Sequence, residues 1–134
     1  MTESVIDEQN LIDHARLAME NAYSPYSQVK VGAALLTKSG MIFSGCNIEN
    51  GSFGLTVCAE RTAVGNAITA GEKEFVAIAI SNSTNRIFQP CGACRQVLSE
   101  FASNLKVIMV AADDEIERAG LDVLLPGKFR YEMD

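Results

Sequence analysis

Three cysteines and one glutamate form the part of the sequence best suited to carry out chemistry. Cys91 and Cys94 have the Cys-x-x-Cys spacing that lets two thiolates bind one metal ion, and Cys58 precedes Glu60 by two residues. Cys58, Cys91 and Cys94 all lie near expected helix starts, where the helix dipole favours thiolates. We expect them to hold one Zn²⁺ per chain. Three protein ligands leave a fourth position open for water, as in catalytic zinc sites.

The position of Glu60 suits work beside the metal rather than binding to it. Two residues of helix turn by about 200°, so Glu60 would not share the direction of Cys58. Zinc lowers the pKa of bound water to about 7. A nearby carboxylate can then take that proton and deliver it to a ring nitrogen and to a leaving amine, as hydrolytic deamination requires. Glu60 is therefore predicted to be the catalytic proton shuttle.

Other residues around the motif leave alternatives open. Arg61 and Arg95 each follow a motif cysteine and could offset the thiolate charge by hydrogen bonding to sulfur, or could be ordinary surface charges. Cys46 would raise the cysteine count to four and complete a closed zinc site in a structural module. Such a non-catalytic module would not need Glu60. An isolated Cys-x-x-Cys can also be a redox pair.

The chain between these residues predicts a single α/β domain over residues 1–134. Apolar periodicity indicates a helix over 8–22, ended by Ser24-Pro25, and a hairpin of two strands follows. Alternation of strands and helices after residue 57 implies parallel pairing. We therefore expect a mixed sheet with helices on both faces. The predicted strands are 29–36, 41–45, 75–81, 106–111 and 115–119, and the predicted later helices are 59–70, 91–102 and 121–125.

Composition limits the class of partner. The net charge is −6, and no cluster of lysine and arginine forms the basic patch that nucleic-acid binding normally needs. The apolar runs are too short to cross a bilayer. The first eight residues are acidic and lack the apolar core of an export signal. These features predict a cytoplasmic protein that binds neither nucleic acid nor membrane.

The motifs together resemble the small, all-cysteine cytidine deaminases over nearly the whole length. A ligand-x-Glu with Pro-Cys-x-x-Cys is the general signature of zinc deaminases. The matching segments are Tyr23–Ser27, Lys30–Leu35, Gly45–Asn50, Cys58–Ala63, Pro90–Leu98 and Leu124–Phe129. The resemblance implies a three-layer α/β/α fold with a five-stranded mixed sheet. It also implies a homotetramer whose active sites are shared between subunits.

The same resemblance implies hydrolysis of cytidine or deoxycytidine to uridine or deoxyuridine, as in pyrimidine salvage. Hydroxide would attack C4 of the base while Glu60 moves protons. Asn47 and Glu49 match the pair that holds a ribose hydroxyl, and the Ala59 N–H matches a contact to the base. The full set of implied substrate-binding residues is Asn47, Glu49, Ala59, Val29, Gly51, Phe53 and Phe129, the last from a neighbouring subunit.

Two residues depart from the family pattern. Val29 stands where phenylalanine is common, and Phe53 stands where tyrosine is common. Neither change alters a predicted zinc ligand or the predicted proton shuttle Glu60. Both bear on which nucleoside is preferred, so deamination of a modified cytosine nucleoside or a nucleoside antibiotic is the second expectation.

Overall fold

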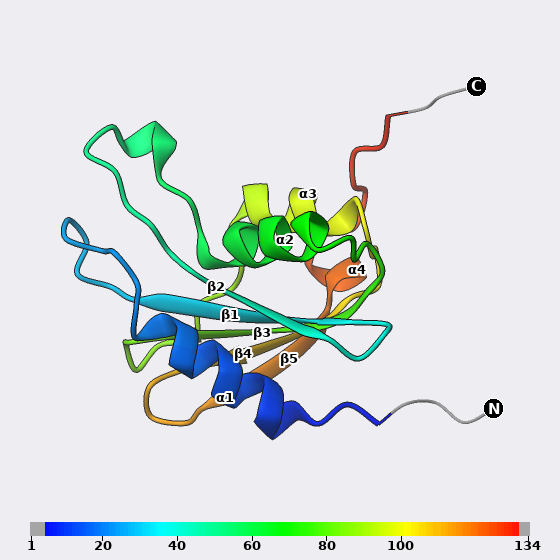
Figure 1. The fold of residues 1–134 in the computed structure, drawn as a ribbon, viewed down its shortest axis with the longest axis horizontal. Coiled ribbons are helices and arrows are strands. Elements are labelled where there is room, and N and C mark those ends of the chain that lie inside the picture. Colours follow the sequence, from blue (N-terminus) through cyan, green and yellow to red (C-terminus); the bar gives the residue numbers. More distant parts are fainter. Residues whose placement is uncertain (1–4, 132–134) are drawn as a thin grey trace.

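The computed structural model describes residues 5–131, so the first four residues of the acidic N-terminal segment lie outside the described residues. One mixed sheet of five strands, in the order β2-β1-β3-β4-β5, carries helices on both faces (Figure 1). The elements are α1 (Glu8–Met19), β1 (Val31–Thr37), β2 (Ile42–Cys46), the 3₁₀-helix η1 (Phe53–Leu55), α2 (Ala59–Thr69), β3 (Phe75–Asn82), α3 (Gly92–Ser99), β4 (Lys106–Val110), β5 (Ile116–Gly120) and α4 (Leu121–Leu124).

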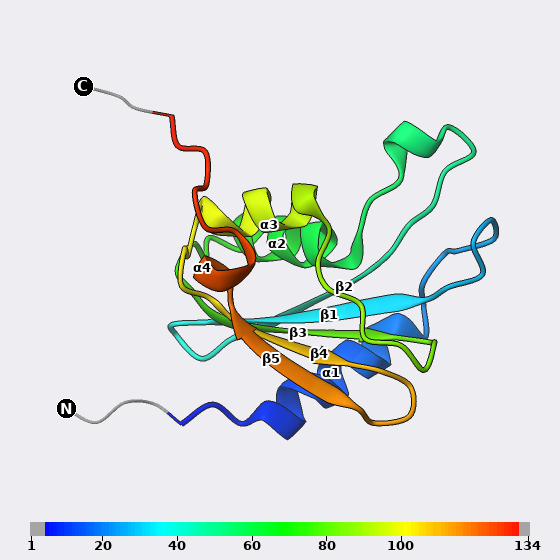
Figure 2. The ribbon, with the colours of Figure 1, turned by 180° about the vertical axis from the view of Figure 1, so that it is seen from behind.

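Strand pairing follows the predicted mixture of directions. β3 and β4 pair in parallel, across the crossover that contains α3, whereas β1 pairs antiparallel with both β2 and β3. β5 returns antiparallel along β4 and forms the edge opposite β2 (Figure 2). The crossover brings the start of α3 beside the start of α2, at one end of the sheet. The expected five-stranded α/β architecture is confirmed.

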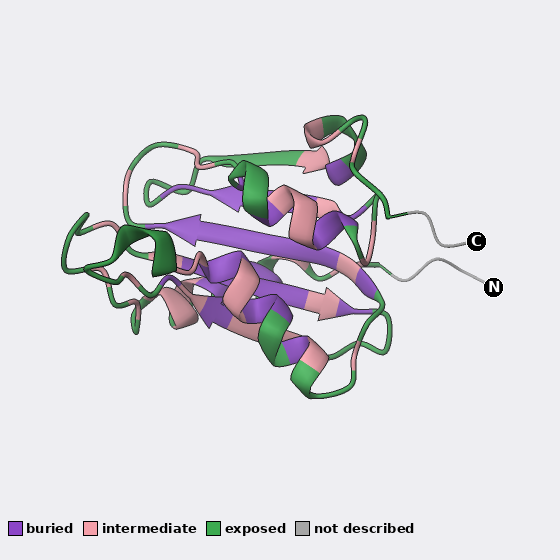
Figure 3. Cartoon of the chain, turned by 90° about the horizontal axis from the view of Figure 1, so that it is seen from above, coloured by how far each residue is buried: buried purple, intermediate pink, exposed green. Residues whose placement is uncertain are grey.

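Two apolar clusters, one on each face of the sheet, hold the layers together. α1 packs Leu11, Ile12 and Ala15 against one face. α2, α3 and α4 cover the other face, where Leu98 and Leu121 are among the fully buried side chains. The central strands are buried on both sides, while β5 and the projecting loops are mostly exposed (Figure 3). The alternating residues of these strands therefore serve both cores.

Three predicted boundaries differ from the structure by two or more residues, and the two helix ends among them have a local reason. The helix expected over 8–22 ends at Met19, and the one expected over 91–102 ends at Ser99. In both cases the next N–H groups bond to the carbonyl three residues back, as from Glu20 to Leu17 and from Phe101 to Leu98. This tighter turn ends the α-helical ladder. β1 begins at Val31 rather than at residue 29.

An ion-pair cluster fastens the start of α1 to the sheet. The carboxylate of Glu8 receives hydrogen bonds from Lys106 of β4 and, at 2.8 Å, from Arg118 of β5. The bond from Arg118, followed by that from Lys106, lowers the pKa of Glu8 to about 2. The contact fixes α1 across two neighbouring strands.

Among the described helices, none has the length and apolar character needed to cross a membrane.

Candidate active site

The three motif cysteines meet at the adjoining N-termini of α2 and α3. Cys58 is the residue before α2, and Cys91 is the residue before α3. The sulfur atoms of Cys58, Cys91 and Cys94 lie within 4.8 Å of one another, and those of Cys58 and Cys91 are 3.8 Å apart. A tetrahedral zinc with Zn–S bonds of about 2.3 Å would separate its sulfurs by about 3.8 Å. The spacing of the sulfurs fits zinc.

The charge state of the thiols also fits a bound cation. The hydrogen bond from Cys94, supported by one from Arg61, lowers the pKa of Cys58 to about 5. The pKa of Cys94 is raised, first by its hydrogen bond to Cys58 and next by burial. One negative charge is therefore readily accommodated, whereas full ionisation of the cluster requires a positive ion to offset the repulsion.

Glu60 lies in the first turn of α2, with only 5% of its surface exposed. Burial raises its pKa to about 7, and the nearby charge of Cys58 acts in the same direction. A glutamate with an ordinary pKa of about 4.3 would be almost fully ionised near pH 7 and would hold a proton poorly. The side chain of Glu60 is thus suited to both accept and return a proton near neutral pH.

The two motif arginines occupy different positions. Arg61 points its Nη2 at the Sγ of Cys58, 3.6 Å away, which is the kind of contact its position suggests. Arg95 makes its hydrogen bonds elsewhere: to the carbonyls of Pro90 and Leu124, both at 2.7 Å, and to the Gln89 side chain. Arg95 therefore braces the segment that leads into Cys91 against the end of α4.

A pocket of about 180 Å³ opens beside the cysteine cluster. Cys58 and Glu60 line one side of it, and Val31, Ile80 and Phe88 supply an apolar wall. Such a wall excludes water from the reacting groups and offers a surface for a flat ring. Phe88 was not singled out from the sequence. Its position three residues before Cys91 is the one signal that could have drawn attention to it.

Asn47 also lines the pocket, and Glu49 follows it two residues later. The side chain of Asn47 is held at both ends, because Nδ2 donates to the carbonyl of Val29 and Oδ1 accepts from the N–H of Val31, each at 2.9 Å. Hydrogen bonds from Ser27, first through its side chain, lower the pKa of Glu49. Ala59 is the first residue of α2, so its N–H has no partner within the helix and can donate to a ligand.

Five of the seven expected substrate contacts lie outside the lining of this pocket: Val29, Glu49, Gly51, Phe53 and Phe129. Val29 contributes its carbonyl to Asn47. Gly51 and Phe53 belong to a loop that projects beyond the sheet (Figure 1). The ring of Phe53 is 75% exposed and meets the edge of Tyr26, with ring centroids 5.9 Å apart. The structure does not bring Phe53 to the pocket of its own chain.

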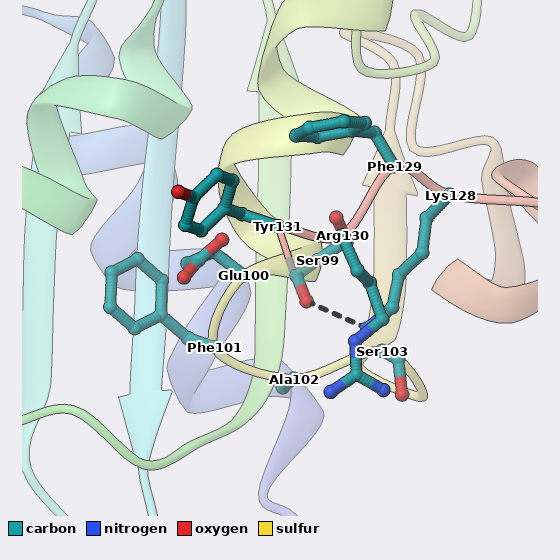
Figure 4. A pocket seen from close by; sticks show the side chains of 9 residues that line it. All are labelled: Ser99, Glu100, Phe101, Ala102, Ser103, Lys128, Phe129, Arg130 and Tyr131. Atoms are coloured by element: carbon teal, nitrogen blue, oxygen red, sulfur yellow. Dashed lines mark hydrogen bonds between the residues drawn. The ribbon is translucent and has the colours of Figure 1, made fainter. Parts of the chain in front are cut away.

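Phe129 lies in a separate hollow beyond the C-terminal end of α3 (Figure 4). Its ring is 69% exposed, and its carbonyl accepts from Gln96 at 3.2 Å. Lys128 fixes the same segment by donating to the carbonyl of Ser99 at 3.1 Å. The hollow shares no lining residue with the cysteine pocket. Phe129 therefore does not line the cysteine pocket of its own chain.

Comparison with known proteins points to one family. Residues 5–111 match the family model described as the cytidine and deoxycytidylate deaminase zinc-binding region. A cytidine deaminase of Halalkalibacterium halodurans is 48% identical over 128 residues, covering 95% of this chain and 97% of the relative. A crystal structure of cytidine deaminase from Burkholderia pseudomallei superposes with a TM-score of 0.88 at 45% identity, covering 92% of this chain and all of that one. A more distant relative is blasticidin-S deaminase of Bacillus cereus, 34% identical over 74% of this chain and 76% of its own length.

Proposed function

The chain belongs to the cytidine and deoxycytidylate deaminase family, and from this premise we propose that it hydrolyses the exocyclic amino group of free cytidine and deoxycytidine. The products are uridine or deoxyuridine and ammonia. The observation that carries the proposal is the burial of Glu60, with a pKa of about 7, beside three converging cysteine sulfurs. A hydrolytic deamination needs this pair of features at one place.

Cys58, Cys91 and Cys94 would hold the metal. When bound there, zinc supplies the Lewis acidity that ionises water near neutral pH. Glu60 would take one proton from water and deliver it to the ring nitrogen, and would then take the proton of the hydroxyl added at C4 and deliver it to the departing amino group. Water's oxygen becomes bonded to C4 of the base as the C–N bond breaks and ammonia leaves. Arg61 offsets part of the negative charge on the sulfur of Cys58.

The remaining contacts select a nucleoside. The free N–H of Ala59 donates to the base, and the apolar wall with Phe88 takes the ring face. Asn47 and Glu49 would hydrogen bond to a sugar hydroxyl, with the ionised carboxylate of Glu49 acting only as an acceptor. A carboxylate at the sugar disfavours a phosphate there because the two charges repel. The site is therefore suited to free nucleosides rather than nucleotides.

Two alternative functions can be distinguished from cytidine deamination by specific observations. Deamination of a modified cytosine nucleoside is supported by the match to a blasticidin-S deaminase, but that match is shorter and less identical than the match to a cytidine deaminase. A non-catalytic zinc module would need Cys46 as a fourth ligand. Among the described residues the metal-competent cluster contains three cysteines, and Cys46 is not one of them.

A substrate panel tests this function. Purified zinc-loaded protein is mixed with cytidine, deoxycytidine, cytosine, CMP, single-stranded DNA and blasticidin S. The reaction is followed by the loss of the ultraviolet absorption band of the cytosine ring and by the release of ammonia. We expect kcat/KM for the two nucleosides to exceed that for cytosine and CMP by at least about 100-fold, since those lack the sugar contacts or add a repelled charge. Preference for blasticidin S would favour the second function, and no turnover of any substrate would refute deamination.

We further propose that the chain works as a homotetramer in which neighbours complete each other's sites. Phe53 and Phe129 are exposed and lie outside the pocket of their own chain. Leu55 and Tyr131 add exposed apolar surface to the same two segments. Exposed apolar clusters of this kind mark protein contacts. A neighbour's Phe129 could then reach the pocket beside Glu60.

Mixed subunits test the shared site. Phe129→Ala alone should lower kcat/KM by about tenfold or more, since an aromatic contact to the substrate is lost. When Phe129→Ala chains are reassembled with Glu60→Gln chains, some sites combine an intact Glu60 with an intact Phe129. The mixture should therefore exceed the summed activity of the two separate variants, with light scattering reporting four chains. Activity equal to that sum would contradict sharing.

The cellular setting belongs to the same proposal. The three ligand thiols must stay reduced to bind metal, and the cytoplasm supplies a reducing environment. We place the protein in the cytoplasm and treat residues 1–134 as one functional domain. The five-stranded sheet supports this, because elements from Glu8 to Leu124 pack on its two faces or form its strands.

A further inference from the structure

The carboxylate of Glu49 is held by a single turn of the chain. Its Oε1 accepts from the N–H of Tyr26 at 2.9 Å and from the N–H of Ser27 at 3.1 Å. Its Oε2 accepts from the hydroxyl of Ser27. Ser27 and Glu49 are 22 residues apart in the sequence, so these hydrogen bonds join two separate loops. Three donors on one carboxylate fix both its direction and its rotation.

The hydroxyl of Ser27 is itself held in place. It accepts a hydrogen bond from the N–H of Val29 at 3.1 Å, which leaves its one hydrogen for Glu49. Its donor is thereby directed at the carboxylate. Glu49 consequently stays ionised, in agreement with its lowered pKa, for which the side chain of Ser27 is the largest cause.

The backbone of this turn is in an unusual conformation. Gln28 has a φ of 61°, in the left-handed region that non-glycine residues rarely adopt, and its N–H bonds to the carbonyl of Ser24 at 2.9 Å. Strain of this kind persists where surrounding contacts determine it, and it often marks functional sites. On one side of Gln28, Ser27 binds Glu49. On the other side, Val29 binds Asn47 at 2.9 Å.

We propose that Ser27 is a positioning residue for sugar recognition, holding Glu49 so that its open lone pairs face a hydroxyl of the nucleoside. The proposal rests on the deaminase function above, because it assigns Glu49 to the sugar. An ionised carboxylate only accepts hydrogen bonds, so the group it recognises must be a donor. The three contacts from the turn leave Oε2 able to accept one more. Ser27 acts through Glu49 and does not touch the substrate.

The test compares Ser27→Ala with the parent on cytidine, 2′-deoxycytidine and 3′-deoxycytidine. KM for cytidine should rise about tenfold, as expected for a weakened hydrogen bond to a charged group, with kcat within about twofold of the parent. For the deoxynucleoside that lacks the hydroxyl bound by Glu49, the KM of the variant and the parent should be equal. Carbon-13 NMR titration of Glu49 should show a higher pKa in Ser27→Ala.

Two control variants accompany the measurement. Ser27→Thr keeps the hydroxyl and should retain the parent KM. Ser83→Ala removes an exposed hydroxyl that accepts from Lys30 of the neighbouring segment at 3.0 Å without contacting Glu49, and it should change neither KM nor the pKa of Glu49. An equal rise in KM for all three substrates, or an unchanged pKa of Glu49, would overturn the positioning role alone. A parent that leaves cytidine unchanged overturns the proposed function, and this inference with it.

Discussion

Replacing Glu60 by glutamine should leave the fold and the bound zinc in place while kcat falls by about 10²–10⁴-fold. The amide has nearly the same shape as the carboxyl group, so the 5% exposed side chain still fits its site. It cannot accept a proton and return it. The loss should appear in kcat rather than in KM, because the proton transfers belong to the transition state and not to substrate binding.

The measurement requires a zinc-loaded variant, checked by metal analysis and circular dichroism. Glu20→Gln is the matched control: it makes the same chemical change at an exposed residue at the end of α1, and it should keep parental kcat. A folded, zinc-loaded Glu60→Gln with unchanged turnover would remove Glu60 from the mechanism. Equal losses in both variants would indicate a general effect of the substitution.

The sequence predicts those parts of the site whose positions depend on residues close together in the chain. Cys58 and Cys91 stand immediately before α2 and α3, as their expected positions at helix starts require. Glu60 follows Cys58 by two residues on the same helix, so its separate direction comes from helix geometry alone. Strand and helix order follow in the same way from apolar periodicity. These features need only the local chain and the rule that parallel strands are joined by a helix.

The parts that the sequence does not predict depend on contacts between distant segments. Arg95 bonds to the carbonyl of Leu124, 29 residues away, because the end of α4 passes close to the start of α3. Ser27 meets Glu49, 22 residues away, in a turn where Gln28 has an unusual φ. The pKa of Glu60 depends on burial beneath neighbouring elements. The residue types alone do not predict these three features. Serine and arginine, for example, are common on protein surfaces and make no such contacts there.

The same distinction between local and distant causes applies to specificity. Val29 and Phe53 attract attention in the sequence because they depart from a pattern, yet neither side chain lines the pocket of its own chain. Phe88 does line it, beside Val31 and Ile80. An aromatic ring at this wall occupies space next to the base. We therefore expect Phe88, rather than Val29 or Phe53 of the same chain, to contact a base bound in this pocket.

Removing one cysteine of the cluster should abolish tight zinc binding, whereas removing Cys46 should not. Cys91→Ser is the better test, because Cys91 is exposed and its replacement disturbs the core less than replacement of the fully buried Cys94. We expect the parent to carry about one zinc per chain, bound by three sulfurs. Cys91→Ser should bind zinc more than about 100-fold more weakly, because losing a ligand costs at least as much as losing a residue that supports one.

Cys46→Ser is the matched control, since it makes the same change at the half-buried cysteine that ends β2, outside the three-sulfur cluster. It should keep one zinc per chain and parental turnover. Metal analysis gives the stoichiometry, and X-ray absorption gives the number of sulfur ligands. Four sulfurs in the parent, together with loss of zinc from Cys46→Ser, would contradict an open catalytic site and support the closed structural module. Three sulfurs with a lighter fourth ligand leave a position for water, and that is the requirement for hydrolysis.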